Sequence, residues 1–175
     1  MRKKTERPMG ARGVTMLECL VVMAVLAMAA VAAAPSIQAV RNRVSVEMTA
    51  RALLAAMNTA RAEALGRHRR VAIAPYDGAN WNSGWVTFVD DNLSDIYDAG
   101  EIRLASYAPL PAGVKVKTNW GLYERPVMAF AENGFLRTKK RGWLSGNVAI
   151  EGHGRRICIT VNAYGRPRVE KVCAK

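Results

Sequence analysis

The stretch that decides the fold is PMGARGVTMLECLVVMAVLAMAAVAAAP, residues 8–35. It begins in a basic segment: residues 1–13 hold five Lys or Arg against Glu6, a net charge of +4. Residues 14–34 are apolar apart from Thr15 and Glu18, and as a helix they would extend about 31 Å, enough to cross a bilayer. A basic segment before an apolar helix is a topology signal that keeps the charged end cytoplasmic. The sequence therefore predicts an N-terminal membrane helix.

Two ordinary alternatives share this topology. A secretory signal peptide would be shorter and end at a small-residue cleavage site, which residues 32–34 could imitate, and an uncleaved signal anchor fits the charge pattern equally well. The distinguishing residue is Glu18, because a carboxylate at the centre of an apolar span costs about 2.5–3.5 kcal/mol on insertion scales. Its simplest explanation is a place in the first helical turn, where the dipole favours negative charge. The other explanation is that the Glu18 carboxylate binds a specific partner group.

The segment Gly13-Val14-Thr15-Met16-Leu17-Glu18 resembles the class III signal of type IV prepilins and type II secretion pseudopilins. The resemblance implies that a prepilin peptidase cuts between Gly13 and Val14 and that Val14 is then N-methylated. It implies that Glu18 meets the N-terminal amine of a neighbouring subunit during assembly. It also implies a helix kink at Pro35, which lies 22 residues into the mature chain. Val14 departs from the Phe that most members carry at this position.

The rest of the chain predicts an α+β fold. An apolar stripe with steps of three and four residues predicts an amphipathic helix over 37–66, with Gly66 as its C-cap, and from residue 70 the period falls to two. The expected strands cover 71–74, 85–89, 101–107, 114–117, 127–131, 148–151, 157–161 and 168–173. We therefore expect a cleaved leader (1–13), a transmembrane or filament-core half-helix (14–36) and a globular domain (37–175) in which the second half-helix packs on antiparallel strands between 70 and 173.

Residues 81–90, WNSGWVTFVD, are similar to the W-x-x-G-W-x-x-F-x-D region of the FimT/GspH minor pilins and pseudopilins. Strand alternation places Trp85, Thr87 and Val89 on one face and Val86 and Phe88 on the other. Such residues are most simply core, so this segment indicates the family and not a site.

A second basic block lies at the other end of the chain, where residues 137–175 hold ten Lys or Arg against two Glu, a net charge of +8. Its last part predicts a hairpin that turns within 162–167. If the hairpin is centred midway between Cys158 and Cys173, these residues face each other and could form a cross-strand disulfide, worth roughly 3 kcal/mol for a loop of ~15 residues. Such a bond fits an exported domain, with Cys19 left free.

The turn itself predicts a ligand site. Gly165 and Pro167 restrain a loop that carries Arg166 and Arg168, arginine forks suit phosphate oxygens, and Tyr164 could stack on a base. A solvated tip with charges for solubility explains the same composition. The FimT branch is associated with DNA uptake in natural transformation, or competence, and its G-R-x-R pattern, which is matched here, is linked to DNA contact. The candidate DNA-binding residues are Arg166, Arg168, Arg155, Arg156, Lys171, Lys139, Lys140 and Arg141.

No catalytic constellation is found, and we expect no enzyme activity, no cofactor and no metal; residues 90–101 are acidic but lack the order of a calcium loop. The expected function is that of a minor type IV pilin that binds DNA without sequence preference. It would cross the bacterial inner membrane once, with its C-terminal domain periplasmic and later in the pilus. Expected partners are other pilins, the pilus assembly machinery, prepilin peptidase and DNA. A GspH-like pseudopilin of type II secretion and a structural assembly subunit without DNA binding remain open alternatives.

Overall fold

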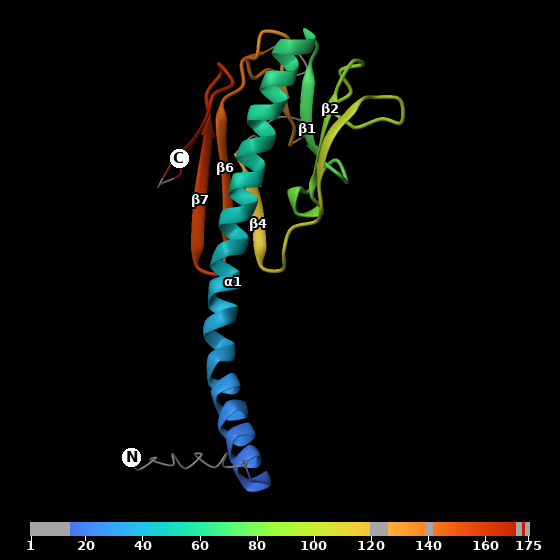
Figure 1. Cartoon of the computed structure of the whole chain (residues 1–175). Helices are drawn as coiled ribbons and strands as arrows, with labels where there is room; N and C mark the ends of the chain where they lie inside the picture. Colours follow the sequence, from blue (N-terminus) through green and yellow to red (C-terminus); the bar gives the residue numbers. More distant parts are fainter. Residues whose placement is uncertain (1–14, 120–125, 139–141, 171–172, 174–175) are drawn as a thin grey trace, which may run out of the picture. The chain divides into compact units, whose positions relative to one another are not determined.

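The computed structural model describes residues 15–119, 126–138, 142–170 and 173, and for 31–37 it describes the backbone alone. Within these ranges one long helix, α1 (Met16–Arg67), precedes all the strands (Figure 1). The strands are β1 (Val71–Pro75), β2 (Trp85–Val89), β3 (Arg103–Tyr107), β4 (Val114–Thr118), β5 (Met128–Phe130), β6 (Gly146–Gly152), β7 (Arg155–Val161) and β8 (Pro167–Glu170), and a short 3-10 helix, η1 (Trp81–Ser83), precedes β2. A helix followed by antiparallel strands confirms the α+β prediction.

The chain divides into two units, residues 1–40 and 41–175, and α1 contributes to both. In the first unit Thr15 begins the helix: its Oγ1 accepts a hydrogen bond of 3.3 Å from the Glu18 N–H, and its carbonyl accepts one of 3.2 Å from the Cys19 N–H. Thr15 is therefore the N-cap, and Glu18 lies in the first turn, where the dipole favours its charge. The described residues include no helix that is both long enough and apolar enough to span a membrane.

In the second unit α1 packs through the stripe that the sequence predicts. Every member of that stripe is buried: Val46, Ala50, Leu53, Met57, Ala60 and Ala64. The predicted end of the helix is wrong, because Gly66 lies inside α1 and the helix ends one residue later at Arg67. The residue in the left-handed conformation is instead His68, with φ of 52°; histidine is one of the non-glycine residues enriched in that region.

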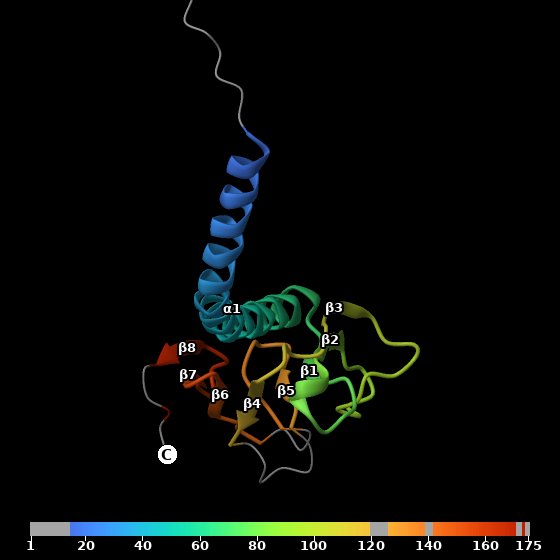
Figure 2. The same ribbon diagram turned by 90° about the horizontal axis from the view of Figure 1, so that it is seen from below.

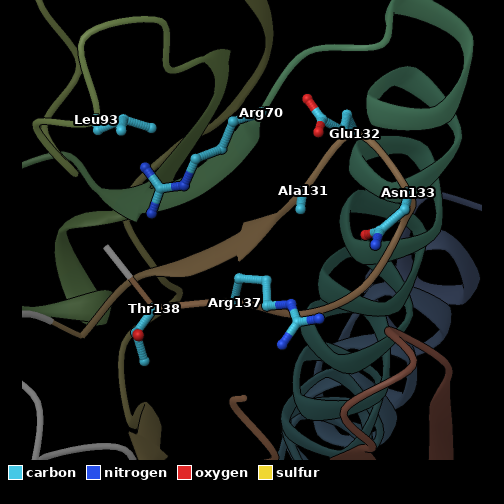
Figure 3. A pocket seen from close by; sticks show the side chains of 7 residues that line it. All are labelled: Arg70, Leu93, Ala131, Glu132, Asn133, Arg137 and Thr138. Carbon is cyan, nitrogen blue, oxygen red and sulfur yellow. The ribbon is translucent and has the colours of Figure 1, made fainter. Parts of the chain in front are cut away.

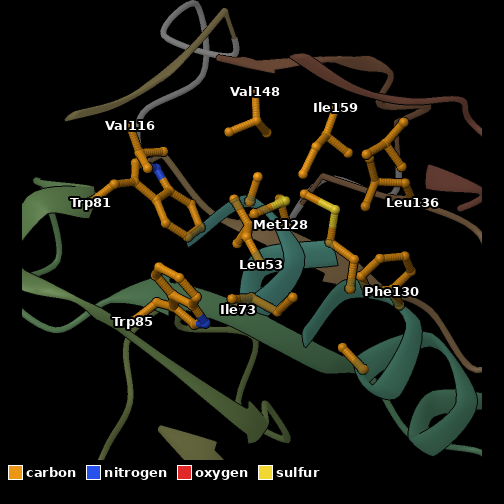
Figure 4. Packing of buried hydrophobic residues seen from close by; sticks show 14 of the residues in the cluster. Leu53, Ile73, Trp81, Trp85, Val116, Met128, Phe130, Leu136, Val148 and Ile159 are labelled. Carbon is orange, nitrogen blue, oxygen red and sulfur yellow. The ribbon is translucent and has the colours of Figure 1, made fainter. Parts of the chain in front are cut away.

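The strands form two antiparallel sheets, β3-β2-β1-β5 and β4-β6-β7-β8. The second half of α1 lies along both sheets in the view of Figure 2, and the buried stripe shares one hydrophobic core with their inner faces. Figure 4 shows Leu53 of α1 and Met128 of β5 at the centre of this core, between Trp81 and Trp85 at one end and Phe130 at the other. The core therefore joins both sheets to one helix.

The alternation predicted for β2 is confirmed, but both of its faces are buried. Trp85 and Val89 belong to the main core, whereas Val86 and Phe88 belong to a second, smaller cluster on the far side of the sheet. Tyr97 helps to cover this cluster, with its ring centroid 5.5 Å from that of Phe88. The segment that follows β2 therefore closes the outer face of the first sheet.

Candidate nucleic-acid interface

The hairpin β7–β8 carries the predicted arginines on a well-defined turn. The Gly165 N–H donates to the Asn162 carbonyl at 2.8 Å, and the Arg166 N–H donates to Asn162 Oδ1 at 3.0 Å. Gly165 is left-handed, with φ of 72°. This is the pattern of a three-residue hairpin loop that ends in a left-handed glycine. The turn is therefore set by Asn162 and Gly165, which both hold the backbone that leads into Arg166.

The turn is also docked on a neighbouring loop. Gly165 is buried, and a Cβ atom at this position would clash with the Gly134 carbonyl oxygen and lie 3.2 Å from ring carbons of Phe130. The Leu136 N–H donates to the Ala163 carbonyl at 3.1 Å. The glycine of the G-R-x-R pattern is thus required by the fold. The two arginines follow a segment of backbone whose position is fixed by packing and hydrogen bonds.

Arg166 and Arg168 both have exposed side chains. Neither has an ion-pair partner among the residues that the structure describes. Arg168 lies opposite Thr160 of β7, so the two side chains share one face of the sheet. Two exposed guanidiniums without a described ion-pair partner therefore follow the turn.

The register of the second sheet extends this face. From the strand register, four cationic and two acidic side chains lie on the face of this sheet that points away from the core. They are Lys115, Lys117, Arg156, Arg168, Glu151 and Glu170. Sequence reasoning missed the two lysines. The alternation of valine and lysine over 114–117 did signal that they point outward, but their place beside β6 depends on a strand order that no local pattern reveals.

Glu151 lies between two of these cations. It is 3.0 Å from Lys117 Nζ and accepts a hydrogen bond of 2.6 Å from Arg156 Nε. The hydrogen bonds from Lys117 and Arg156, helped by the attraction of both charges, outweigh the partial burial of Glu151 and lower its pKa below the ordinary value. Arg156, a predicted DNA contact, is therefore already partly neutralised. Arg155 is exposed at the start of β7, at the opposite end of the strand from the turn.

The Cys158–Cys173 disulfide is confirmed, with Cα atoms 5.3 Å apart, and Cys19 is free. The predicted hairpin register is wrong. Cys158 lies opposite Glu170, and β8 ends at that residue instead of continuing to Cys173. The physical reason is the short loop closed by Gly165, which centres the hairpin nearer to Cys158 than the cysteine spacing suggests. The bond therefore joins β7 to residues that follow β8 and does not bridge two paired strands.

Several predicted residues lie outside the described part of the chain. They are Gly13, Val14, Lys139, Lys140, Arg141 and Lys171. The residues on either side of 139–141 are described: the Thr138 N–H donates to the Gly142 carbonyl at 3.0 Å. The next residue, Trp143, has its ring centroid 6.2 Å from that of Tyr164. The segment that follows this basic triplet thus reaches the hairpin turn.

A pocket of about 280 Å³ lies between Arg70, Leu93, Thr138 and the loop at 131–133 (Figure 3). Arg70 does not offer a free charge to it, because this side chain pairs with Asp90 and Asp95. Arg69 likewise pairs with Asp91. Three of the acidic residues that follow β2 therefore pair with arginines. The described residues contain no group of three His, Cys, Asp or Glu side chains that could hold a metal ion.

Comparison with known proteins identifies the family. Residues 49–165 match the family model described as type II transport protein GspH, and residues 8–34 match the prokaryotic N-terminal methylation motif. The first match covers more than half of the chain, so the protein belongs to the GspH family, whose members include type IV minor pilins and pseudopilins. These families are structural and not enzymatic.

Individual relatives agree with this assignment. The pilin-like protein PilA1 of Thermus thermophilus is 35% identical over 91 residues, which make up 51% of this chain and 55% of that protein. The chain thus spans about half the length of this relative. Two crystal forms of the type IV minor pilin FimU of Pseudomonas aeruginosa superimpose with TM-scores of 0.53 and 0.54 at 20% identity, covering 74% and 73% of this chain and 88% and 91% of FimU. These likenesses show a shared minor-pilin fold.

Proposed function

We propose that this protein is a minor type IV pilin that binds DNA through the β7–β8 hairpin during uptake in natural transformation. The observation that carries the proposal is the pair Arg166 and Arg168. Both are exposed, both lack an anionic partner among the described residues, and both follow a turn fixed by Asn162 and Gly165. A guanidinium held in this way loses little conformational freedom when it meets a phosphate.

The cations on the outer face of the second sheet suggest that DNA contacts a row of side chains and not the turn alone. Lys115, Lys117 and Arg156 lie on the same face as Arg168, and Arg156 is four residues from the position opposite Arg168, about 13 Å along β7. Contacts spread over such a length suit a polyanion, and they recognise the phosphate backbone instead of base sequence. The proposal includes five further candidates for phosphate contact: Lys139, Lys140, Arg141, Arg155 and Lys171.

The N-terminal motif completes the proposal. Prepilin peptidase would cut between Gly13 and Val14, Val14 would be methylated, and residues 14–36 would anchor the subunit in the inner membrane with the C-terminal domain periplasmic. In the filament Glu18 would pair with the amine of a neighbouring pilin. The expected partners are therefore other pilins, the assembly machinery, the peptidase and DNA.

The test uses a fragment from Gln38 to Lys175. Among the residues whose burial the structure describes, the first buried hydrophobic residue is Val46, so the fragment keeps all of them. Fluorescence anisotropy with duplex DNA should show weak, salt-sensitive binding. With ~3–4 phosphate contacts the log–log salt slope should be about −3. Replacing Arg166 and Arg168 with Gln should make that slope shallower by about 2.

A matched control removes two exposed arginines elsewhere: Arg43→Gln on α1 and Arg103→Gln on β3. This control changes net charge equally and should leave DNA affinity nearly unchanged. If the wild-type fragment binds no DNA at low salt, or if both pairs have the same effect, DNA uptake is the wrong function. The GspH-like pseudopilin of type II secretion, which the family match also supports, then becomes the better proposal, beside a purely structural pilin.

A further inference from the structure

We infer that four residues beside the turn form a platform for an unpaired nucleobase, so that this protein prefers DNA with single-stranded segments. The residues are Phe135, Arg137, Trp143 and Tyr164, called here the aromatic platform. This inference rests on the proposed DNA binding and adds to it the class of DNA that is recognised.

The three rings of the platform contact one another on the surface. The Phe135 centroid lies 5.7 Å from that of Trp143 and 5.3 Å from that of Tyr164, and the last two rings are 6.2 Å apart. Both Tyr164 contacts are edge-on, with interplanar angles of 88° and 76°. Trp143 is 56% exposed and Tyr164 57% exposed. Burial in the core therefore does not explain these two side chains.

Backbone contacts hold the platform in place. Arg137 and Trp143 form an antiparallel bridge, the Arg137 N–H donates to the Ala129 carbonyl at 2.9 Å, and Tyr164 belongs to the turn that Gly165 closes. The rings thus come from two chain segments that are each tied to the sheets. A surface that is already ordered loses little entropy when a flat ligand stacks on it.

The arrangement of charge favours a nucleotide. The guanidinium carbon of Arg137 lies 3.8 Å from the centroid of the Trp143 ring and 5.7 Å from that of Phe135, which are cation–π contacts. Tyr164 is separated from Arg166 by Gly165 alone. A base stacked on Tyr164 or Trp143 would therefore bring its phosphate towards the Arg166 guanidinium. Stacking rings beside a basic track are the usual means of binding single strands without sequence preference.

A protein neighbour is the competing occupant, since Trp, Tyr and Arg also dominate protein–protein contacts. The positive charge of the segment that contains most of the platform favours nucleic acid as the ligand. Residues 137–175, which contain three of the four platform residues, carry a net charge of +8, and Lys139-Lys140-Arg141 precede Gly142 and Trp143 directly in the sequence. A segment of this charge attracts a polyanion more strongly than a segment of balanced charge.

The experiment measures anisotropy with a 12-nucleotide oligo-dT strand and with a duplex of equal length. It uses the fragment from Gln38 and, alongside it, the full chain in detergent micelles. The variant Trp143→Leu with Tyr164→Leu should weaken oligo-dT binding at least tenfold, because each stacked base contributes about 5- to 150-fold. Duplex affinity should stay within about twofold. The matched variant Trp143→Phe with Tyr164→Phe keeps flat rings and should bind oligo-dT almost normally.

Crosslinking of the wild-type protein to a strand that contains 5-bromouracil avoids any folding defect of the variants. Peptide mapping should place the crosslink at Trp143 or Tyr164, and crosslinks that map only elsewhere overturn the inference. So does a leucine variant that weakens duplex and single strand equally, or that binds DNA normally but is not incorporated into pili. In these cases the proposed function still holds if the Arg166/Arg168 variant loses duplex binding. Failure of the wild-type protein to bind either DNA overturns both.

Discussion

Gly165 shows how one residue serves both the fold and the proposed site. The sequence motif links it to the arginines, whereas the structure places it in a left-handed conformation against the Gly134 carbonyl. The left-handed backbone costs a non-glycine residue roughly 1–2 kcal/mol, and here the added methyl group also clashes with backbone that cannot rotate away. Gly165 is therefore a structural requirement that fixes where Arg166 begins.

Gly165→Ala should lower the free energy of unfolding by more than that ~1–2 kcal/mol. Urea denaturation of the fragment from Gln38 measures this. Gly154→Ala is the matched control. Gly154 has a similar φ of 75°, but a methyl group added there would have no neighbour within 4 Å. That substitution should therefore cost only the free energy of the left-handed backbone conformation. Equal losses for the two variants would show that docking of the turn on Gly134 contributes nothing.

Glu151 gives the second sheet a pH dependence. Its pKa is lowered in the folded protein, first by the hydrogen bond from Lys117 and then by that from Arg156. A lowered folded-state pKa means that the contribution to stability is present above the ordinary value of 4.5 and is lost as the pH falls below it through the folded-state value. Urea midpoints between pH 6 and pH 3 should fall less steeply in Glu151→Gln than in the wild type, and parallel curves would contradict this.

The same substitution should strengthen DNA binding. Glu151→Gln removes the carboxylate that neutralises Lys117 and Arg156, so both cations become available to phosphate. Duplex affinity at low salt should rise, and the salt slope should steepen by up to about 2. Glu47→Gln is the control, because it frees Arg51 on α1, away from the sheet. A rise of the same size in the control would indicate a general charge effect and not a track on the outer face.

Among the elements, α1 and the strands could be predicted far better than their pairing. The apolar stripe predicted the second half of α1, and the period-two segments predicted all eight described strands, because helix and strand periods are local properties of the sequence. The hairpin register depended instead on Asn162 and Gly165, whose hydrogen bonds select a three-residue loop, and the cysteine spacing misled the prediction. The order of β4 beside β6, and hence the position of Lys115, is a long-range property that local patterns do not contain.

The disulfide is the main covalent support of the β7–β8 hairpin. It closes a loop with a sequence separation of 15 residues, which is worth roughly 3 kcal/mol in the chain-entropy model. Replacing both Cys158 and Cys173 with Ala should therefore lower the urea midpoint substantially, with faster hydrogen exchange in β8 than in β1. The Cys19→Ala variant of the full chain is the control and should keep wild-type exchange. Unchanged exchange in β8 without the bond would contradict this role.

At the scale of the whole molecule, we expect cleavage of the leader and methylation of the new N-terminus to produce the mature pilin. The matched methylation motif spans residues 8–34, and the proposed cut lies after Gly13. Mass spectrometry of protein co-expressed with a prepilin peptidase should give a chain that begins at methylated Val14, and Gly13→Glu should retain the leader. Gly10→Glu, in the same leader, is the control and should still be cut. An N-terminus near Pro35 would instead indicate ordinary signal peptidase.

The position of the disulfide also has a mechanical consequence. Arg166 and Arg168 lie inside the loop that Cys158 and Cys173 close. Under the proposed function, a load from captured DNA enters the protein within this loop. The bond ties Cys173, which follows β8, to Cys158 in the middle of β7, so separation of β8 from β7 cannot extend the chain beyond this loop. During filament retraction, the load would therefore be resisted by the second sheet, into which β7 is built, and not only by the hydrogen bonds of the four-residue strand β8.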